Sequence, residues 1–377
     1  MKKVIFGITS LQIGGAERVL VDLCNKLKDE YAITIFTIYD NGELKKQLSN
    51  RISVKSVYKK RYEDYDKIQK IAISIKLLFT KIPEGYDDYV AFLEGPITRL
   101  FAKNIKNKRK NIKKIAWIHN DISKVFGKGI KSKIKEKVDK HLYKKYDKLI
   151  FVSEENKDDF NKLYGSEKYN EEVIRNYLDY KNVIEKSNQD VYVDFDEKDI
   201  NLVSVCRLVD QKAIDRFIKI HSKLENDGIH SKVYIIGEGN LHYALQKQID
   251  SLGETENFYL LGAKQNPYVY MKKADYFCLL SYYEGYGMVL DEAKILNKEI
   301  IITKTAAVEG IKDYKKKTIL ENTDKGIYEG LKAILTGNNV QNANKEEVND
   351  EYIAKLDEYY NGIIKKVEKI LRWKYQF

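Results

Sequence analysis

The chain has 377 residues, with 67 Lys and Arg against 56 Asp and Glu, and a formal net charge of +11. This length exceeds what one hydrophobic core usually supports, so two domains are expected. No apolar run approaches the roughly 18 residues that a membrane-spanning helix needs, and the short apolar start indicates a first strand without a signal peptide. The three cysteines and five histidines lack disulfide or metal-ligand spacing, which favours reduced core cysteines in a cytoplasmic protein without a zinc site.

Positive charge is concentrated in one segment of the sequence. Residues 101–150 contain 17 Lys and Arg and 4 Asp and Glu, so their excess is larger than that of the whole chain. Phe126, Tyr143 and Tyr146 lie among these lysines. Such a segment indicates an anionic partner: membrane headgroups, a lipid diphosphate or nucleic acid. Solvated helix faces are the simpler interpretation of the same charge run.

The first half of the chain alternates between strand and helix patterns. A strand over residues 3–10 is followed by the turn Leu11–Gly15, and then by an amphipathic helix with apolar residues at helical spacing up to Leu27. The turn lacks G-x-G-x-x-G, the fingerprint of dinucleotide-dependent dehydrogenases. A further helix is predicted near 66–81. Further strands are predicted at 31–38, 52–57, 88–93, 114–118 and 149–153.

A second strand and helix series begins after a weakly patterned linker at Ser187–Asp190. Its strands are predicted at 201–206, 233–236, 258–261, 275–280 and 299–302. Two such series predict an α/β protein with two doubly wound parallel sheets, each a Rossmann-like domain, facing each other across a cleft. We expect these domains at 1–185 and 195–350, and a C-terminal helix over 351–377 that packs back on the first domain.

The stretch Ser281–Glu292 carries the most specific pattern in the chain. It follows an apolar strand, so Glu284 lies at a strand's carboxyl end, where ligands bind in sheets of this type. Gly285 and Gly287 allow a sharp turn, and the next helix begins with unpaired N–H groups that can bind an anion. Glu284 and Glu292 beside an anion site suit a ligand that carries both phosphate and sugar hydroxyls.

The order of the motifs resembles that of the retaining glycosyltransferases of family 4, which have GT-B architecture. Glu284–Glu292 resembles their E-x7-E motif, Cys206–Lys212 their arginine and lysine element, and Gly237–Gly239 their G-x-G turn. Cys206 and Ala213 replace glycines that are usual in the family. Residues 303–309 also differ from the family's glycine-containing loop. Further matches are Gly14–Arg18, His119, Ser153, Asn176 and Asn266–Pro267.

The resemblance implies a role for each matched residue. Arg207 and Lys212 offset phosphate charge as the diphosphate departs, so no metal or other cofactor is expected. Glu284 holds hydroxyls of the donor sugar, Glu292 holds the ribose, and His119 contacts the transferred sugar. The other predicted donor-site residues, which supply backbone amides or close approach, are Gly15, Gly237, Gly239, Tyr286, Gly287 and Met288.

Several weaker signals have simpler structural interpretations. Gly14 and Glu94 are predicted on the acceptor side, although a tight turn explains Gly14 equally well and a simple strand end is the favoured interpretation of Glu94. Asp194–Asp196 has the D-x-D spacing of metal-dependent transferases, but it falls in the linker, and we reject it as a metal site. Residues 101–148 are predicted to dock on an anionic membrane surface.

The resemblance therefore implies a metal-independent hexosyltransferase at the inner face of the cell membrane. It implies a nucleoside-diphosphate sugar as donor, with a UDP-sugar favoured. The implied acceptor is a lipid-linked or polymeric glycan in bacterial cell-surface polysaccharide, capsule, cell-wall or teichoic-acid synthesis. Two alternatives stay open: a nucleotide-sugar epimerase or hydrolase of the same fold, and a basic nucleic-acid-binding protein suggested by the net charge.

Overall fold

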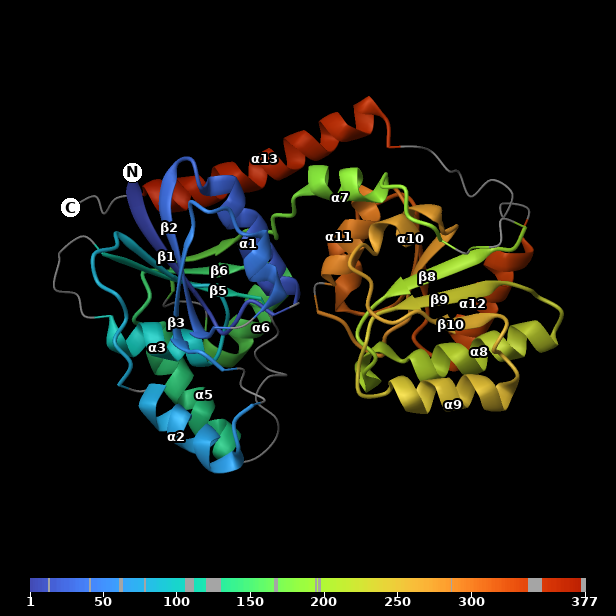
Figure 1. Cartoon of the computed structure of the whole chain (residues 1–377), viewed down its shortest axis with the longest axis horizontal. Coiled ribbons are helices and arrows are strands. Elements are labelled where there is room, and N and C mark those ends of the chain that lie inside the picture. Colours follow the sequence, from blue (N-terminus) through green and yellow to red (C-terminus); the bar gives the residue numbers. More distant parts are fainter. Residues whose placement is uncertain are drawn as a thin grey trace. The chain divides into compact units, whose positions relative to one another are not determined.

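The computed structural model describes residues 1–12, 14–40, 42–60, 64–77, 79–105, 112–119, 130–165, 169–193, 195, 198–285, 287–337 and 348–373, with only the backbone at 67, 70, 71, 74 and 130–135. The chain divides into two compact units. Unit 1 comprises Met1–Asp179 together with Glu358–Phe377, and unit 2 comprises Tyr180–Asp357. The division at 179/180 lies six residues before the predicted end of the first domain at 185. Each unit contains one parallel sheet with helices on both faces (Figure 1).

Unit 1 contains a seven-stranded sheet in the order β3-β2-β1-β4-β5-β6-β7, and all neighbouring strands are parallel. The six predicted strands of this half are confirmed with small differences at their ends, whereas β7 was not predicted. The strands are β1 (Lys2–Ile8), β2 (Tyr31–Tyr39), β3 (Ser53–Tyr58), β4 (Asp88–Ala91), β5 (Lys113–Ile118), β6 (Lys148–Phe151) and β7 (Glu171–Val173). The helices are α1 (Gly15–Leu27), η1 (Glu43–Gln47), α2 (Lys67–Leu77), α3 (Pro96–Asn104), α5 (Ile130–Tyr143) and α6 (Glu154–Tyr164).

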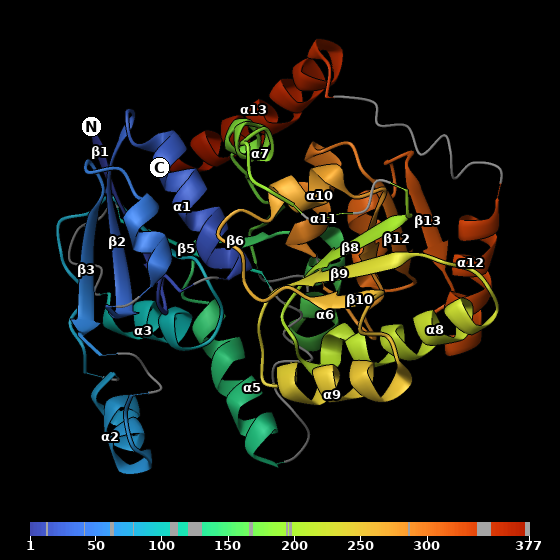
Figure 2. The ribbon, with the colours of Figure 1, turned by 45° about the vertical axis from the view of Figure 1, so that its right-hand side comes forward.

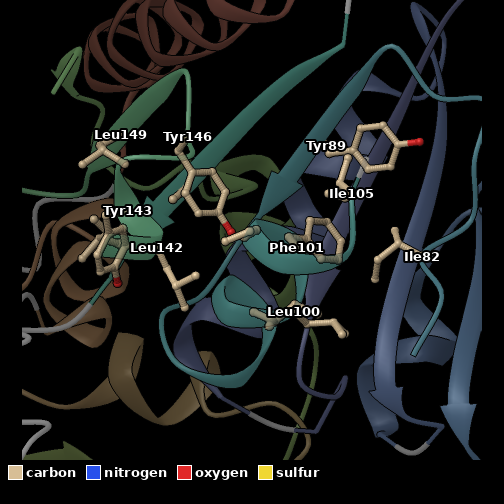
Figure 3. Close-up of a cluster of buried hydrophobic side chains, with 14 of the residues drawn as sticks. Ile82, Tyr89, Leu100, Phe101, Ile105, Leu142, Tyr143, Tyr146 and Leu149 are labelled. Carbon is tan, nitrogen blue, oxygen red and sulfur yellow. The ribbon is translucent and has the colours of Figure 1, made fainter. Parts of the chain in front are cut away.

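Aliphatic and aromatic side chains together fill the core between the unit 1 sheet and helices α3 and α5 (Figure 3). Phe101 of α3 packs close to β1 because residue 7 is glycine: a Cβ there would lie 2.4 Å from the Phe101 ring. The Tyr146 hydroxyl donates to the Thr98 carbonyl at 2.5 Å. Tyr143 and Tyr146 are buried, so the expectation that they accompany lysines on a membrane-facing surface is wrong.

Helix α13 (Asp350–Arg372) begins in unit 2 and ends on unit 1. The Lys113 Nζ donates to the Ile370 carbonyl at 2.6 Å, and Lys2 donates to the Leu371 carbonyl. Both lysines form ion pairs with Asp88, which is completely buried, at 2.9 Å for Lys2 and 3.5 Å for Lys113. Burial raises the pKa of Asp88 and lowers the pKa of Lys113 to about 8. The cations therefore cap the helix C-terminus at the amino ends of β1, β4 and β5.

Unit 2 contains a six-stranded parallel sheet in the order β10-β9-β8-β11-β12-β13. Helices α8, α9 and α12 cover one face, and α7, α10 and α11 cover the other (Figures 1 and 2). The strands are β8 (Asn201–Val205), β9 (Lys232–Ile236), β10 (Phe258–Leu260), β11 (Tyr276–Leu279), β12 (Glu299–Thr303) and β13 (Lys317–Leu320). The helices are α7 (Tyr180–Ser187), η2 (Asp210–Lys212), α8 (Ile214–Asn226), α9 (His242–Leu252), α10 (Tyr268–Lys273), α11 (Met288–Ile295), η3 (Ala306–Ile311) and α12 (Asp324–Thr336).

The two sheets share one topological property that locates binding sites. In each sheet the first strand is internal: β1 lies between β2 and β4, and β8 lies between β9 and β11. Chain connections leave such a strand in opposite directions, which opens a crevice at the carboxyl ends of the two central strands. The prediction of two doubly wound parallel sheets is confirmed, and the β1/β4 and β8/β11 ends are where ligand-binding residues are expected.

Candidate functional site

The carboxyl ends of β8 and β11 bring together two residues that the sequence singled out. Lys212, in η2 after β8, forms an ion pair with Glu284 Oε1 after β11. The Ser281 hydroxyl donates to the same carboxylate oxygen at 2.6 Å. Ser281 and Glu284 are buried, and the Lys212 side chain is 14% exposed. Residues distant in sequence thus form one desolvated cluster of cation, carboxylate and hydroxyl.

Two glycines hold the loops after β8 and β9 in backbone contact. Gly237 has φ +144°, and a Cβ there would lie 1.9 Å from the Cys206 carbonyl oxygen. A Cβ at Gly239 would lie 2.2 Å from the Leu208 carbonyl oxygen. Any side chain at these positions would displace the segment that carries Arg207. Because Arg207 itself is exposed, these glycines help to present a cation to solvent directly after β8.

The start of α11 supplies the anion-binding part of the predicted site. Gly287 precedes the helix with φ +67°, a left-handed conformation that favours glycine, and the first N–H groups of the helix begin at Met288. A Cβ at Gly285 would meet nothing within 4 Å, so that glycine borders open space. Tyr286 lies outside the described residues.

Glu292 is held by a residue that sequence reasoning missed. Its Oε1 accepts a hydrogen bond from the Tyr268 hydroxyl at 3.0 Å, and both side chains are buried. Tyr268 begins α10, directly after the Asn266–Pro267 pair that the sequence had marked, and the Asn266 Oδ1 accepts from the Tyr268 N–H at 3.2 Å. That pair was the available signal, because it fixes where the helix carrying Tyr268 starts.

The corresponding edge of unit 1 brings His119 and Glu94 together. His119 follows β5, and Glu94 follows β4. The backbone N–H of His119 donates to Glu94 Oε2 at 3.1 Å. The His119 carbonyl accepts from Asn156 Nδ2 at 3.1 Å, and Asn156 lies on α6, which the Ser153 hydroxyl caps. The imidazole ring packs against Phe92, with ring centroids 4.7 Å apart. The predicted histidine is thus fixed by backbone contacts rather than by its ring nitrogens.

The electrostatic state of His119 restricts its chemistry. Burial lowers the pKa of the imidazole to about 3, so the ring is neutral at physiological pH. Its Nε2 is buried and has no hydrogen-bond partner within the described part of the chain. A neutral ring nitrogen that lacks a partner suits a hydrogen bond with a ligand hydroxyl and does not suit an ion pair with phosphate.

The glycine turn of unit 1 is less constrained than the glycines of unit 2. Gly14 precedes α1 in an extended conformation with φ −160°, and Gly15 is the first residue of the helix. A Cβ at Gly14 would meet only the flexible Glu17 carboxylate, at 2.2 Å. The backbone at Gly14 therefore does not require glycine. This result is consistent with the simpler interpretation of Gly14 as part of a tight turn into α1.

The lysines of the basic segment 101–148 differ in their exposure to solvent. Residues 106–111 and 120–129 lie outside the described part of the chain. Within the described remainder, Lys113 and Lys114 are buried, so the expectation of a continuous basic surface over 101–148 is wrong at these two positions. The exposed lysines that remain are Lys103, Lys137, Lys144 and Lys145.

The described residues contain neither a metal-ligand cluster nor a helix that could span a membrane. No three His, Cys, Asp or Glu side chains there are grouped to hold a metal ion, and Asp194 and Asp196 fall outside this part of the chain. None of the described helices combines the length and the apolar character needed to cross a membrane.

Comparison with known proteins agrees with this geometry. The family model for Glycosyltransferase Family 4 matches residues 13–181, and that for Glycosyl transferases group 1 matches residues 185–350. The chain is 26% identical over 357 residues to the N-acetylgalactosamine-N,N'-diacetylbacillosaminyl-diphospho-undecaprenol 4-alpha-N-acetylgalactosaminyltransferase of Campylobacter jejuni, with 92% of the chain and 94% of the relative covered. A second Campylobacter jejuni relative, GalNAc-alpha-(1->4)-GalNAc-alpha-(1->3)-diNAcBac-PP-undecaprenol alpha-1,4-N-acetyl-D-galactosaminyltransferase, is 28% identical over 93% of the chain and 92% of its own length.

Solved structures show the same fold over almost the whole chain. Anabaena HepE in complex with UDP and glucose has a TM-score of 0.75 and 17% identity, covering 98% of this chain and 99% of HepE. TarM of S. aureus, solved with UDP, has a TM-score of 0.69 and 16% identity, covering 99% and 100%. At these identities the likeness establishes the architecture, whereas the site must be judged from its own residues.

Proposed function

Because the chain belongs to the glycosyltransferases of family 4 and group 1 and has the GT-B fold, we propose that it transfers a hexose-type sugar from a UDP-sugar to a lipid-linked glycan. The observation that carries this proposal is the desolvated Lys212–Glu284–Ser281 cluster at the strand ends of unit 2. The names of the two Campylobacter relatives support a diphospho-undecaprenol-linked acceptor and an N-acetylgalactosaminyl donor. The UDP in the HepE and TarM complexes supports the nucleotide.

The donor diphosphate is held by positive charge in unit 2. Arg207, Lys212 and the first N–H groups of α11 offset the charge that grows on the diphosphate as it leaves. Lys212 pairs with Glu284 in the free enzyme, so donor binding directs the lysine to phosphate and leaves Glu284 to accept sugar hydroxyls. The hydrogen bond from the Tyr268 hydroxyl orients the Glu292 carboxylate. In that orientation Glu292 accepts hydrogen bonds from the ribose hydroxyls.

We propose transfer with retention of configuration and without a covalent enzyme intermediate. The bond between the anomeric carbon and the diphosphate oxygen breaks, the acceptor oxygen forms a bond to the same face of that carbon, and the acceptor proton passes to the departing diphosphate oxygen. His119, which is neutral, donates or accepts one hydrogen bond with a hydroxyl of the transferred sugar and does not act as the base. The arginine and lysine take the place of a metal ion, so turnover is expected to be unchanged in EDTA.

We also propose that unit 1 lies on an anionic membrane at its cytoplasmic face. Ile68 and Ile75 on α2, and Phe79 just beyond it, are 80%, 56% and 79% exposed and recur at helical spacing. Exposed Lys76 and Lys81 flank them, an arrangement that suits an interface of acyl chains and acidic headgroups.

Flotation with vesicles tests this docking. Vesicles containing phosphatidylglycerol are expected to carry the protein at low salt, and neutral vesicles to carry much less. Replacing Ile68 and Phe79 with serine is expected to abolish flotation, whereas the matched change Tyr243→Ser, at an exposed residue of unit 2, is expected to leave it intact. Equal flotation of both variants would contradict the proposal.

A screen of nucleotide sugars by thermal unfolding tests the donor, since a ligand of the native state raises the melting temperature. We expect UDP-sugars to stabilise the protein, with UDP-N-acetylgalactosamine the first candidate. Glu292→Gln and Arg207→Ala should abolish the shift, and Glu321→Gln, at an exposed residue of unit 2, should preserve it. No shift with any nucleotide sugar would contradict the proposal.

The reaction itself is tested by incubating the donor with a diphosphate-linked glycan and determining the anomeric configuration of the product. An α-linked product from an α-linked donor is expected. Donor consumption that does not depend on acceptor would instead identify a hydrolase or epimerase.

A further inference from the structure

The segment between β11 and Glu284 is fixed by side chains from other elements. Each of its four backbone carbonyls accepts a side-chain hydrogen bond. The pairs are Arg216 Nη2 to Leu280 at 2.5 Å, Thr303 Oγ1 to Ser281 at 2.8 Å, Asn322 Nδ2 to Tyr282 at 2.9 Å and Gln211 Nε2 to Tyr283 at 3.0 Å. A loop held in this way has little freedom to move, so the position of Glu284 is set before a donor arrives.

Arg216 contacts this segment through a hydrogen bond and through an aromatic ring, and it also holds Asn322, another donor in the set. It lies in the first turn of α8 and is only 4% exposed. Besides the Leu280 carbonyl, it donates Nη1 to Asn322 Oδ1 at 2.9 Å, and its guanidinium lies 4.3 Å from the centre of the Tyr282 ring. The bond to Oδ1 fixes the orientation of the Asn322 amide, which then donates Nδ2 to the Tyr282 carbonyl.

Asp324 and Asp215 act on the charge of Arg216 only from a distance. No ion pair joins it to an acidic side chain in the described part of the chain, although Arg216 is buried. A buried cation without an ion pair costs stability unless its N–H groups are hydrogen-bonded. The hydrogen bonds and the ring contact of Arg216 lie on the segment leading to Glu284 or on Asn322, which holds the same segment, while Arg216 Nε has no hydrogen-bond partner among the described residues. The planar guanidinium can donate in two directions and stack on a ring at once, whereas a lysine ammonium cannot.

We propose that Arg216 is a positioning residue for the transfer reaction, acting on Glu284 through the Leu280–Tyr283 backbone without touching the donor. The proposal rests on the proposed function, since it takes Glu284 to bind the donor sugar. It implies a division within unit 2: Arg216 affects the reacting sugar, whereas UDP, which lacks that sugar, is held by other residues. Loss of Arg216 should therefore reduce turnover while leaving UDP binding intact.

The first test compares Arg216→Gln and Arg216→Lys in steady-state transfer. Misplacing a reacting group by about 1 Å costs roughly 100-fold, so we expect Arg216→Gln to lower kcat by roughly 10- to 100-fold. The donor KM and the UDP-induced thermal shift should stay near wild type, and Arg216→Lys should recover part of the loss. Tyr282→Leu, which removes only the stacked ring, should have a smaller effect. A matched control is Arg99→Gln, because Arg99 makes a two-point contact with Asp139 in unit 1.

The second test needs no donor. Hydrogen exchange of the free protein should accelerate in peptides covering residues 280–285 of Arg216→Gln and stay unchanged there in Arg99→Gln. Acceleration throughout the unit 2 sheet, or wild-type kcat in Arg216→Gln, would overturn the proposal because Arg216 would then be only structural or dispensable. In a double-mutant cycle with Glu284→Gln, the loss caused by Arg216→Gln should largely vanish, and full additivity would also overturn it. If the wild type transfers no sugar at all, the proposed function fails, and hydrogen exchange still decides whether Arg216 positions the segment.

Discussion

The central strand ends of the two units have the same topology and opposite chemistry. In unit 2 Lys212 pairs with the buried Glu284 where β8 and β11 end, and the exposed Arg207 follows β8. In unit 1 a neutral imidazole packs among aromatic rings where β1, β4 and β5 end. The doubly wound sheet determines where such residues gather, and the side chains determine which chemical groups each edge can bind. Charge in unit 2 suits a diphosphate, and the neutral edge of unit 1 suits sugar hydroxyls.

Removing the charge from the unit 2 edge should have the largest effect. Lys212→Ala deletes a cation that stabilises the departing diphosphate, so transfer is expected to fall by roughly 100- to 1,000-fold. Transfer rates with saturating donor measure this loss. Lys219→Ala, at an exposed lysine of α8, is the control. A Lys212→Ala rate within a few-fold of wild type would show that the ion pair with Glu284 is only structural.

Removing one hydrogen bond at the same edge should have an intermediate effect on donor affinity. Tyr268→Phe removes the hydroxyl that orients Glu292 and keeps the buried ring, so the donor should bind less tightly by about 1 kcal/mol, or roughly fivefold. Titration with UDP measures this change directly. An unchanged UDP affinity would mean that Glu292 keeps its orientation without Tyr268, or that Glu292 does not bind the ribose.

The smallest predicted effect concerns stability and pH at the unit 1 edge. His119 has a folded-state pKa of about 3 against an ordinary value of 6.5. Between these values the unfolded chain binds more protons than the folded chain, so His119 makes stability fall as pH falls through this window. His119→Gln should therefore lose less stability than wild type between about pH 7 and about pH 5.

Melting temperatures at the two pH values measure the difference. His230 gives a control of opposite sign, because its hydrogen bond with Glu225 raises its pKa. His230 favours the folded state at low pH, and this contribution is lost as pH rises through the raised pKa. His230→Gln should then lose slightly more stability on acidification than wild type. Equal acid sensitivity of His119→Gln and wild type would show that the imidazole is not buried as neutral.

The sequence predicted the sheet architecture because apolar periodicity reports which residues a strand buries. β13 escaped prediction because it begins at the third of three consecutive lysines and leaves Ile319 exposed at 41%. Candidate residues at strand ends were also predictable, since the turn glycines and carboxylates follow the strands directly. Their partners were not. Arg216 and Asn322 hold the segment that leads to Glu284, and Tyr268 holds Glu292. These contacts depend on packing between elements far apart in the chain, so no local sequence pattern predicts them.

The basic segment shows how a local pattern can mislead. Lys113 and Lys114 look like surface charge in the sequence, yet they begin the buried strand β5. Lys113 is kept inside by Asp88 and by the end of a helix from the far end of the chain. Lys114 is also desolvated, and burial lowers its pKa. Composition counts charges, and only tertiary structure shows which of them reach solvent.

The clamp formed by Lys2, Asp88 and Lys113 on α13 affects the order in which the chain folds during synthesis. Unit 2 is one continuous segment, whereas unit 1 lacks the helix that covers its buried ion pairs until residues 358–373 have left the ribosome. Domains usually fold in the order of their synthesis. Here unit 1 is synthesised first but completed last. Asp88 and Lys113 therefore lack the covering helix during the time in which unit 2 folds. A nascent chain that has left the ribosome only as far as residue 357 would therefore hold a folded unit 2 and an incomplete unit 1.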